Sequence, residues 1–353
     1  MTYIISGIQQ VGIGVANVHE GFKWYNKNLG MDVPIFEEAA EAALMLPYTG
    51  GMPQKRHAIL AINMNGGGGF EIWQYTSRTP QASSFKPQLG DLGLFCAKIK
   101  TKNIYNTFNF LKSQQVKILG QITKSPIGKQ HFFMEDAFGN LFEIIEDSVW
   151  FGKGLKETGG PIGMIIGVSN LEKSIQFYSS ILGYDKILYQ GESSYEDFLP
   201  LPGGNVINKR AILTHSKNRV GPFSELFGTS YIELIEAKNY TPRKIFENRF
   251  WGDLGFIHLC FDIKNMNALR TACEKQGHPF TVDGGAGFEM GEAAGHFTYI
   301  EDPDGTLIEF VETKKIPIMK KWGWYLDLTK RQPGKALPKW MLKTLGLNRK
   351  KFN

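Results

Sequence analysis

The sequence predicts an α+β protein of four βαβββ modules, which pair into two curled cups of mixed β-sheet. Three observations predict this fold class. The two halves of the chain repeat each other, each half contains the same order of elements twice, and the strand segments alternate apolar and polar residues. Such a module leaves one apolar sheet face uncovered, so we expect the modules to pair in order to bury it.

The internal repeat is the strongest of these signals. At an offset of 153 positions, Val15 aligns with Val168 and Tyr25 with Tyr178. The offset becomes 162 at the word Gly-Asp-Leu-Gly, found at 90–93 and 252–255, and 166 at the closing segments "EDAFGNLFEII" and "EDPDGTLIEFV". A repeat interrupted by only short insertions indicates a duplicated domain.

Each half divides into two modules. The segment "VGIGV" has the period of a half-buried strand, and "NVHEGFKWYNKNLG" predicts a helix that begins after Asn17 and ends at Gly30. The turns "DAFGN" and "DPDGT" predict the final hairpins. We therefore divide the chain into a first domain, a second domain and a C-terminal tail. Their ranges are 1–150 (modules 7–76 and 90–147), 151–312 (modules 160–238 and 252–312) and 313–353.

Composition and charge narrow the class of protein. The chain has 353 residues, of which 42% are hydrophobic and 21% charged, as in ordinary globular proteins. It shows no signal peptide and no apolar run long enough to span a membrane, and its three cysteines are too few for a disulfide framework. These features predict a cytoplasmic protein. The net charge of +6 conceals a basic tail, because 313–353 carry twelve Lys and Arg against one acid, Asp327.

A family resemblance follows from three segments: "VSNLEKSIQFYSSILGY" at 168–184, "GFIHLCFDI" at 255–263 and "EDPDGTLIEF" at 301–310. With the repeated βαβββ order, they resemble the vicinal oxygen chelate superfamily. This superfamily includes glyoxalase I, bleomycin resistance proteins and extradiol dioxygenases. The resemblance covers about residues 5–312 and leaves the tail outside. It implies that two modules close a cup around one divalent metal, with ligands from the first and last strand of each module.

The resemblance assigns ligand positions in this chain. The first-strand positions are Gln10, Cys96, Gly163 and His258, and the last-strand positions are Glu71, Glu143, Glu233 and Glu309. Modules 1 and 4 together give Gln10, Glu71, His258 and Glu309, a set similar to that of eukaryotic-type glyoxalase I. Modules 2 and 3 give Cys96, Glu143, Gly163 and Glu233, which we interpret as a vestigial site.

The donor types agree with this assignment. Two carboxylates, an amide oxygen and an imidazole suit one divalent ion, and Zn, Ni, Co, Mn and Fe(II) all remain open. Such an ion would act as a Lewis acid toward two neighbouring substrate oxygens. The sequence thus predicts a metal-dependent lyase or isomerase, with His258 and Glu309 as catalytic residues and Glu309 as the group that moves the proton.

The predicted substrate is small and apolar or aromatic. Glyoxalase I has Arg, Arg and Asn where this chain has Gly14, Leu254 and Tyr75. A buried glutathione carboxylate would find no partner there, so we do not expect a glutathione-linked reaction. We predict that Trp73, Tyr75, Phe256 and His296 contact the substrate, since they surround the expected cup.

Two other functions remain open. An Fe(II) extradiol-type ring-cleaving dioxygenase would pair modules 3 and 4 and use His258 and Glu309. It would need His215, or His296 as a second candidate, in place of a first-strand histidine, because that position is Gly163. A metal-free protein that binds or sequesters a small molecule would explain the degraded second site.

Apart from the substrate, the predicted binding partner is a membrane surface that the tail would contact. The segment "LPKWMLKTLGLNRKKF" mixes Trp and Leu with Lys and Arg, which suits peripheral contact with an anionic membrane. The alternative is that the tail packs across the other half of the chain or a second subunit. Nucleic acid is not expected, because the body is acidic and lacks a recognition motif. We expect a monomer or a homodimer.

Overall fold

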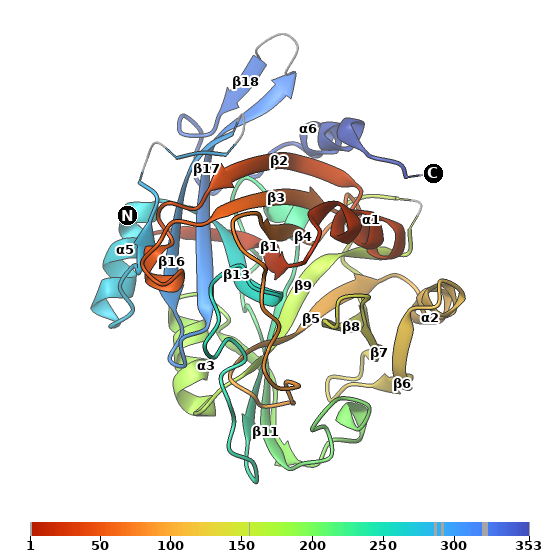
Figure 1. Ribbon diagram of the computed structural model, residues 1–353. Coiled ribbons are helices and arrows are strands. Elements are labelled where there is room, and N and C mark those ends of the chain that lie inside the picture. Colours follow the sequence, from red (N-terminus) through yellow and green to blue (C-terminus); the bar gives the residue numbers. More distant parts are fainter. Residues whose placement is uncertain (1, 155, 286–287, 291–292, 320–323, 353) are drawn as a thin grey trace.

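The computed structural model describes residues 2–154, 156–285, 288–290, 293–319 and 324–352. Within these residues the chain forms two curled sheets, one of ten strands and one of eight, with helices beside them (Figure 1). This confirms the predicted α+β class and its two curled mixed-sheet cups.

The first sheet combines the first and fourth modules. Its strand order is β14-β16-β17-β13-β1-β4-β3-β2, with β15 added to β16 and β18 to β17. The strands from the first module are β1 (Ile4–Gly14), β2 (Val33–Glu41), β3 (Lys55–Ile62) and β4 (Gly69–Tyr75). Those from the fourth module and the tail are β13 (Gly255–Lys264), β14 (Val282–Asp283), β15 (Phe288–Met290), β16 (Ala293–Glu301), β17 (Leu307–Met319) and β18 (Trp324–Asp327).

The second sheet combines the second and third modules in the order β10-β11-β12-β9-β5-β8-β7-β6. Its strands are β5 (Gly93–Thr101), β6 (Lys117–Lys124), β7 (Gln130–Glu135), β8 (Leu141–Glu146), β9 (Thr158–Gly167), β10 (Lys186–Ser193), β11 (Asn208–Thr214) and β12 (Tyr231–Ala237). In both sheets the two first strands pair antiparallel, and each first strand pairs parallel with its module's last strand. Each cup therefore draws one module from each half of the chain.

The module helices begin at equivalent asparagines. They are α1 (Val18–Leu29), α2 (Ile104–Ser113), α3 (Leu171–Ser180) and α5 (Met266–Lys275). Asn17, Asn103, Asn170 and Asn265 precede them, and each side chain accepts a hydrogen bond from a backbone N–H of the first turn. Gly30 ends α1 with a φ of 70°, as its sequence position predicts. There are also two short helices: α4 (Ser224–Phe227), between β11 and β12 of the third module, and α6 (Lys339–Lys343), in the tail.

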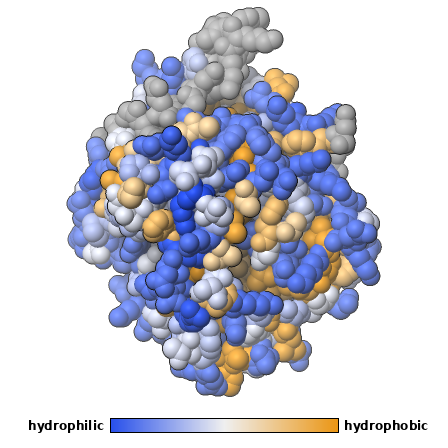
Figure 2. Space-filling view, viewed as in Figure 1, coloured by the Kyte–Doolittle hydropathy of each residue, from blue (hydrophilic) through white to orange (hydrophobic). Residues whose placement is uncertain are grey.

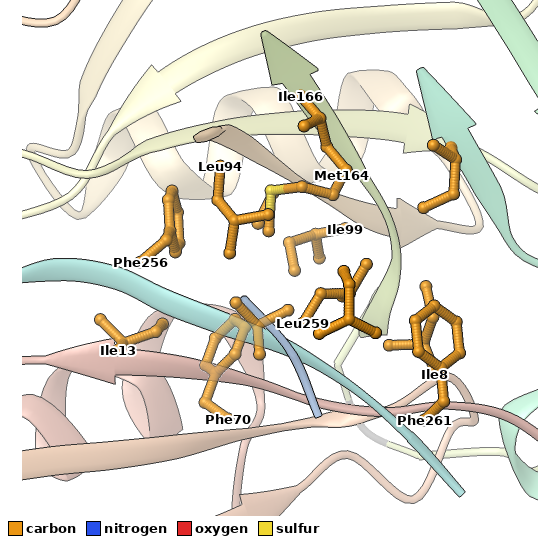
Figure 3. Close-up of a cluster of buried hydrophobic side chains, with 14 of the residues drawn as sticks. Ile8, Ile13, Phe70, Leu94, Ile99, Met164, Ile166, Phe256, Leu259 and Phe261 are labelled. Carbon is orange, nitrogen blue, oxygen red and sulfur yellow. The ribbon is translucent and has the colours of Figure 1, made fainter. Parts of the chain in front are cut away.

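The main hydrophobic core lies between the two sheets. Figure 3 shows Ile13, Phe70 and Leu259 of the first sheet facing Leu94, Met164 and Ile166 of the second. Because side chains alternate along a strand, the residues between these core positions point into the concave cup of their own sheet. Gln10, Glu71, His258 and Glu309 all occupy such alternate positions.

The last strand of the fourth module extends beyond the predicted boundary at 312. β17 runs to Met319 because β18 pairs with it antiparallel, from Lys315 with Asp327 onward. The basic tail thus starts as a continuation of the first sheet and then crosses the molecule to α6, near β2 (Figure 1).

Candidate metal centre

Strand pairing brings the four predicted ligands of modules 1 and 4 together. In the middle of the first sheet, Gly12 of β1 lies beside both Glu71 of β4 and His258 of β13. Gln10 lies two residues earlier on β1, and Glu309 lies on β17 beside Cys260. All four side chains therefore converge in one cup.

The distances between the four side chains are short. The Nε2 of His258 is 3.0 Å from Oε2 of Glu309 and 3.4 Å from Oε2 of Glu71. The Nε2 of Gln10 is 3.2 Å from Oε2 of Glu309 and 3.3 Å from Oε2 of Glu71. The ligand atoms of Glu71, His258 and Glu309 all lie within 4.8 Å of one another, and the three residues are buried.

A glycine makes room for the imidazole. A Cβ atom added at Gly12 would lie 2.5 Å from Cε1 of His258, closer than real Cβ contacts come. Any other residue at this position would displace the ring. The glycine pattern of "VGIGV" therefore has a packing role at Gly12 in addition to forming a strand.

Burial and charge set the protonation of this cluster. Burial alone would lower the pKa of His258, but the carboxylates of Glu309 and Glu71 raise it to about 9. Burial would raise the pKa of Glu309, and the neighbouring His258 holds it below its ordinary value. The Oη of Tyr299 lies 3.3 Å from Nδ1 of His258 and orients the ring so that Nε2 faces the carboxylates.

Aromatic residues fill the rest of the cup. Trp73 and Tyr75, two of the residues predicted to contact substrate, follow Glu71 on the same face of β4, and both are buried. Trp251 was not predicted. Its ring is stacked over His258, with centroids 6.3 Å apart, and lies 4.5 Å from the ring of Trp73. Trp251 directly precedes the second Gly-Asp-Leu-Gly word, and this repeat was the signal that could have identified it.

The structure places Phe256 and His296 outside the cup. A β-bulge opposite Gly12 and Ile13 turns Phe256 toward the core between the sheets, where it packs against Phe142 (Figure 3). His296 lies on β16 on the face opposite Tyr299, and its Nε2 is 2.5 Å from Oδ1 of Asp283. Neither side chain joins the four predicted ligands, because period-two alternation and the bulge point them elsewhere.

The second cup contains a lysine between its two last-strand glutamates. Lys98 forms ion pairs with Glu143 and with Glu233, the latter at 2.5 Å, and all three side chains are buried. A Cβ atom at Gly163 would lie 2.9 Å from Cδ of Lys98, so this glycine makes room for the lysine. Burial raises the pKa of Cys96 well above its ordinary value, which keeps it a neutral thiol. Cys96 and Gly163 therefore supply no ionised donor.

Further charged side chains complete this buried network. Arg210 pairs with Glu233 at 2.5 Å and with Asp197 at 2.8 Å, while Nδ1 of His131 lies 2.7 Å from Oε1 of Glu143. Sequence reasoning missed these partners. Lys98 could have been found, since it lies two residues after Cys96 and hence on the same face of its strand.

The residues required for the dioxygenase alternative are not brought together. Modules 3 and 4 belong to different sheets, and Gly163 lies beside Lys98 in the second. His215 follows β11 in that same sheet, where its Nδ1 lies 2.8 Å from the backbone oxygen of Lys217. It therefore cannot join His258 and Glu309 in the first cup.

The aspartates of the repeated Gly-Asp-Leu-Gly sequence hold the linkers in place by hydrogen bonds. Asp253 accepts hydrogen bonds from the backbone N–H groups of Gln81 and Phe250 and pairs with Arg78. Asp91 likewise accepts from the Tyr240 hydroxyl and from backbone N–H groups of Gln88 and Arg243. Each aspartate thus holds a linker from the other half of the chain, so the word has a structural role in both copies.

Comparisons with known proteins agree with this architecture. Two models of the glyoxalase/bleomycin resistance protein/dioxygenase superfamily match residues 7–144 and 164–299. The chain belongs to this superfamily. No match to the chain is found among curated proteins.

Solved structures show the same fold. Glyoxalase I from Zea mays is 14% identical with a TM-score of 0.52, and the match covers 87% of this chain and 92% of that one. A "putative dioxygenase" from Bacillus subtilis is 12% identical with a TM-score of 0.55, covering 88% of this chain and 86% of that one. At these identities the likeness establishes the fold alone. Among the described residues, no helix is both long and apolar enough to cross a membrane.

Proposed function

We propose that the chain is a divalent-metal-dependent lyase or isomerase whose metal ligands are Gln10, Glu71, His258 and Glu309. The observation that carries the proposal is the convergence of these four buried donors from first and last strands of two modules. In an apolar cup, two carboxylates cost free energy unless a cation compensates them.

The donor set fits a divalent ion. The Oε1 atom of Gln10 is buried without a hydrogen-bond partner, so it is free to serve as a ligand. The Nε2 of His258 points at both carboxylates, while its Nδ1 lies 3.3 Å from the hydroxyl of Tyr299, so Nε2 is the ring nitrogen that faces the donor set. Zn, Ni, Co, Mn and Fe(II) are all compatible with this oxygen-rich set. When bound, the ion would supply Lewis acidity toward two adjacent substrate oxygens.

Glu309 is the residue that we assign to proton transfer. It is the carboxylate closest to His258, with its Oε2 3.0 Å from Nε2, and an ionised carboxylate at this place can accept a proton from the substrate. Glu71 and Gln10, which contact each other across the cup, we assign as metal-binding groups.

The surroundings favour a small apolar or aromatic substrate. Trp73, Tyr75, Trp251 and Tyr299 surround the donors and are all buried. Trp251 is also a wall of a cavity of about 380 Å³, which Phe250 and Phe256 line as well. Trp251 therefore lies between this cavity and His258, and we propose that the substrate reaches the donors past its ring.

Glutathione does not fit this cup. Gly14 packs against the backbone carbonyl of Asp253, which leaves no room for a side chain. The hydroxyl of Tyr75 donates to the backbone oxygen of Trp251 and is not free to bind a ligand. The guanidinium of Arg78 lies 4.8 Å from the ring centroid of Tyr75, but it is already paired with the buried Asp253 and is not free to pair with a substrate carboxylate.

Metal content after purification without chelator tests the proposal. We expect about one divalent ion per chain in the wild type. In His258→Ala we expect an at least tenfold lower metal occupancy, because one of the four metal ligands is lost. His57→Ala is the matched control, since His57 belongs to an exposed group with His19 and Glu37 that could also hold an ion. Loss of metal from His57→Ala, or equal metal in wild type and His258→Ala, would overturn the assignment.

A further inference from the structure

The C-terminal segment has one packed side and one exposed side. Leu342 of α6 is 1% exposed and lies in a cluster with Leu328, Leu337 and Phe227. The backbone N–H of Lys350 donates to the carbonyl of Asp32 at 2.7 Å, which fixes the end of the segment beside α1 and β2. The expected packing of the tail across the body is therefore present, and it leaves the opposite side facing solvent.

The exposed side carries two large apolar residues. Trp340 is 64% exposed and Leu347 is 85% exposed. Helix α6 continues directly into a 3₁₀ helix (Thr344–Asn348), so both residues belong to one continuous helical segment. Lys343 lies between them and is exposed as well. Most of the surface in Figure 2, in contrast, is hydrophilic, with apolar residues scattered among polar ones.

A basic cavity adjoins this exposed side. Its volume is about 800 Å³, and its lining residues include Lys102, Lys153, Lys343 and Arg349. Among the lining residues in the described part of the chain, none is acidic. Trp150 forms an apolar wall, with the Nζ of Lys102 5.0 Å from its ring centroid. Arg349 is held in place by Asp32 at 3.0 Å, outside the lining.

The positive charge of the chain is concentrated in the C-terminal tail. Residues 313–353 carry twelve basic residues and one acid, while the rest of the chain has 28 basic and 33 acidic residues. The tail is therefore strongly cationic, whereas the remainder of the chain is mildly acidic. A cation-rich surface with exposed Trp and Leu is complementary to an anionic lipid bilayer, whose interface accepts Trp rings and whose headgroups attract Lys.

We propose that this face docks the protein on an anionic membrane surface. Trp340 and Leu347 enter the interface, and Lys343 reaches the headgroups together with the basic side chains of the cavity. The inference is independent of the proposed metal centre, since it uses none of its residues. Nucleic acid fits less well, because Leu347 offers nothing to a phosphate backbone.

Vesicle co-sedimentation tests the proposal on the full-length protein. We expect binding to vesicles of phosphatidylcholine mixed with phosphatidylserine, and little binding to phosphatidylcholine alone. High salt should release the protein, because it screens the headgroup charge. Equal binding to both vesicle types, or binding to neither, would contradict the proposal.

Paired variants separate the two contributions. Trp340→Ala with Leu347→Ala should weaken binding by about tenfold or more, because the apolar anchor is lost. Lys153→Glu with Lys343→Glu should weaken it by more than about fivefold per lysine. The controls are Met52→Ala with Leu199→Ala, which are 65% and 56% exposed, and the exposed Lys186→Glu. All these side chains are exposed, so circular dichroism should show an unchanged fold.

Two further outcomes would overturn the docking proposal. If the controls weaken binding as much as the tail variants, the contact is nonspecific. If light scattering shows a wild-type dimer that Trp340→Ala with Leu347→Ala converts to a monomer, and the vesicles bind neither, the face is an interface between two copies of the chain.

Discussion

Lys98 and His258 show how a single side chain decides what each cup can hold. Both cups keep two last-strand glutamates, Glu71 with Glu309 and Glu143 with Glu233. In the second cup the ammonium group of Lys98 lies between the pair, where it compensates both charges. In the first cup His258 and Gln10 face the pair and offer ligand atoms instead. We infer that an internal cation has made a bound ion unnecessary in the second cup.

Removing the charge of Lys98 should therefore destabilise the fold. Lys98→Met leaves Glu143 and Glu233 buried without their shared cation. We therefore expect the free energy of unfolding to fall by about 3–5 kcal/mol. Denaturant unfolding measures this difference. Lys186→Met is the control, because that lysine is exposed and its loss should change stability by less than about 0.5 kcal/mol. A similar effect of both substitutions would show that the buried lysine does not compensate the glutamates.

Asp262 gives a pH dependence of known sign. It is buried on β13, and burial raises its pKa from 3.8 to about 7. Between these two values the folded protein binds a proton that the unfolded chain does not, so stability rises as the pH falls from about 7 toward 4. Above about pH 7 the folded state holds a buried charge and this stability is lost. The full effect is roughly 4 kcal/mol.

Asp262→Asn should remove this pH dependence, because an amide does not titrate. The measurement is the free energy of unfolding of wild type and variant at several pH values. We expect their difference to change steadily between about pH 4 and pH 7 and to be flat above. Parallel stability curves for the two proteins across this range would contradict the assigned pKa.

The linkers before β5 and β13 contribute side chains to the two cups. Each ends in a Gly-Asp-Leu-Gly word, and the residue before the word, Leu89 or Trp251, packs into a cup. The aspartate of each word is fully buried and accepts backbone hydrogen bonds from a linker of the other half. The linkers are therefore parts of the cup walls.

Asp253→Asn should loosen the linker that carries Trp251. The amide cannot accept as many hydrogen bonds as the carboxylate and loses the ion pair with Arg78, so we expect a loss of about 1–3 kcal/mol. Thermal unfolding measures the loss, and Glu274→Gln on an exposed position is the control. If the two variants melt together, Asp253 does not hold the linker.

Local signals predicted the elements well, and long-range packing accounts for the differences. The caps of the helices are local signals, whereas the ligand positions Gln10, Glu71, His258 and Glu309 came from the family resemblance, and their convergence depends on the pairing of β1 with β13. The β-bulge that turns Phe256 away depends on pairing between β1 and β13, which are far apart in the chain. The contacts of Lys98 with Glu233 depend on pairing of β5 with β9 in the same way.

The molecule as a whole assembles each cup from both halves of the chain. Module 1 pairs with module 4 and module 2 with module 3, so the two sheets pack against each other through one common core (Figure 1). The hypothesis of a metal site shared by modules 1 and 4 requires that these two modules lie in one sheet, and they do. The dioxygenase alternative requires modules 3 and 4 in one sheet, and they lie in different sheets. The predicted domains join modules that are neighbours in the sequence (1 with 2, and 3 with 4). The sheets instead join module 1 with module 4 and module 2 with module 3.

Anomalous diffraction from crystals grown with Mn(II) tests the central claim most directly, because it locates the ion itself. We expect one strong peak between Gln10, Glu71, His258 and Glu309, and none between Glu143 and Glu233, where Lys98 provides the cation. A peak only at His19, Glu37 and His57, or no peak in the first cup, would contradict the account.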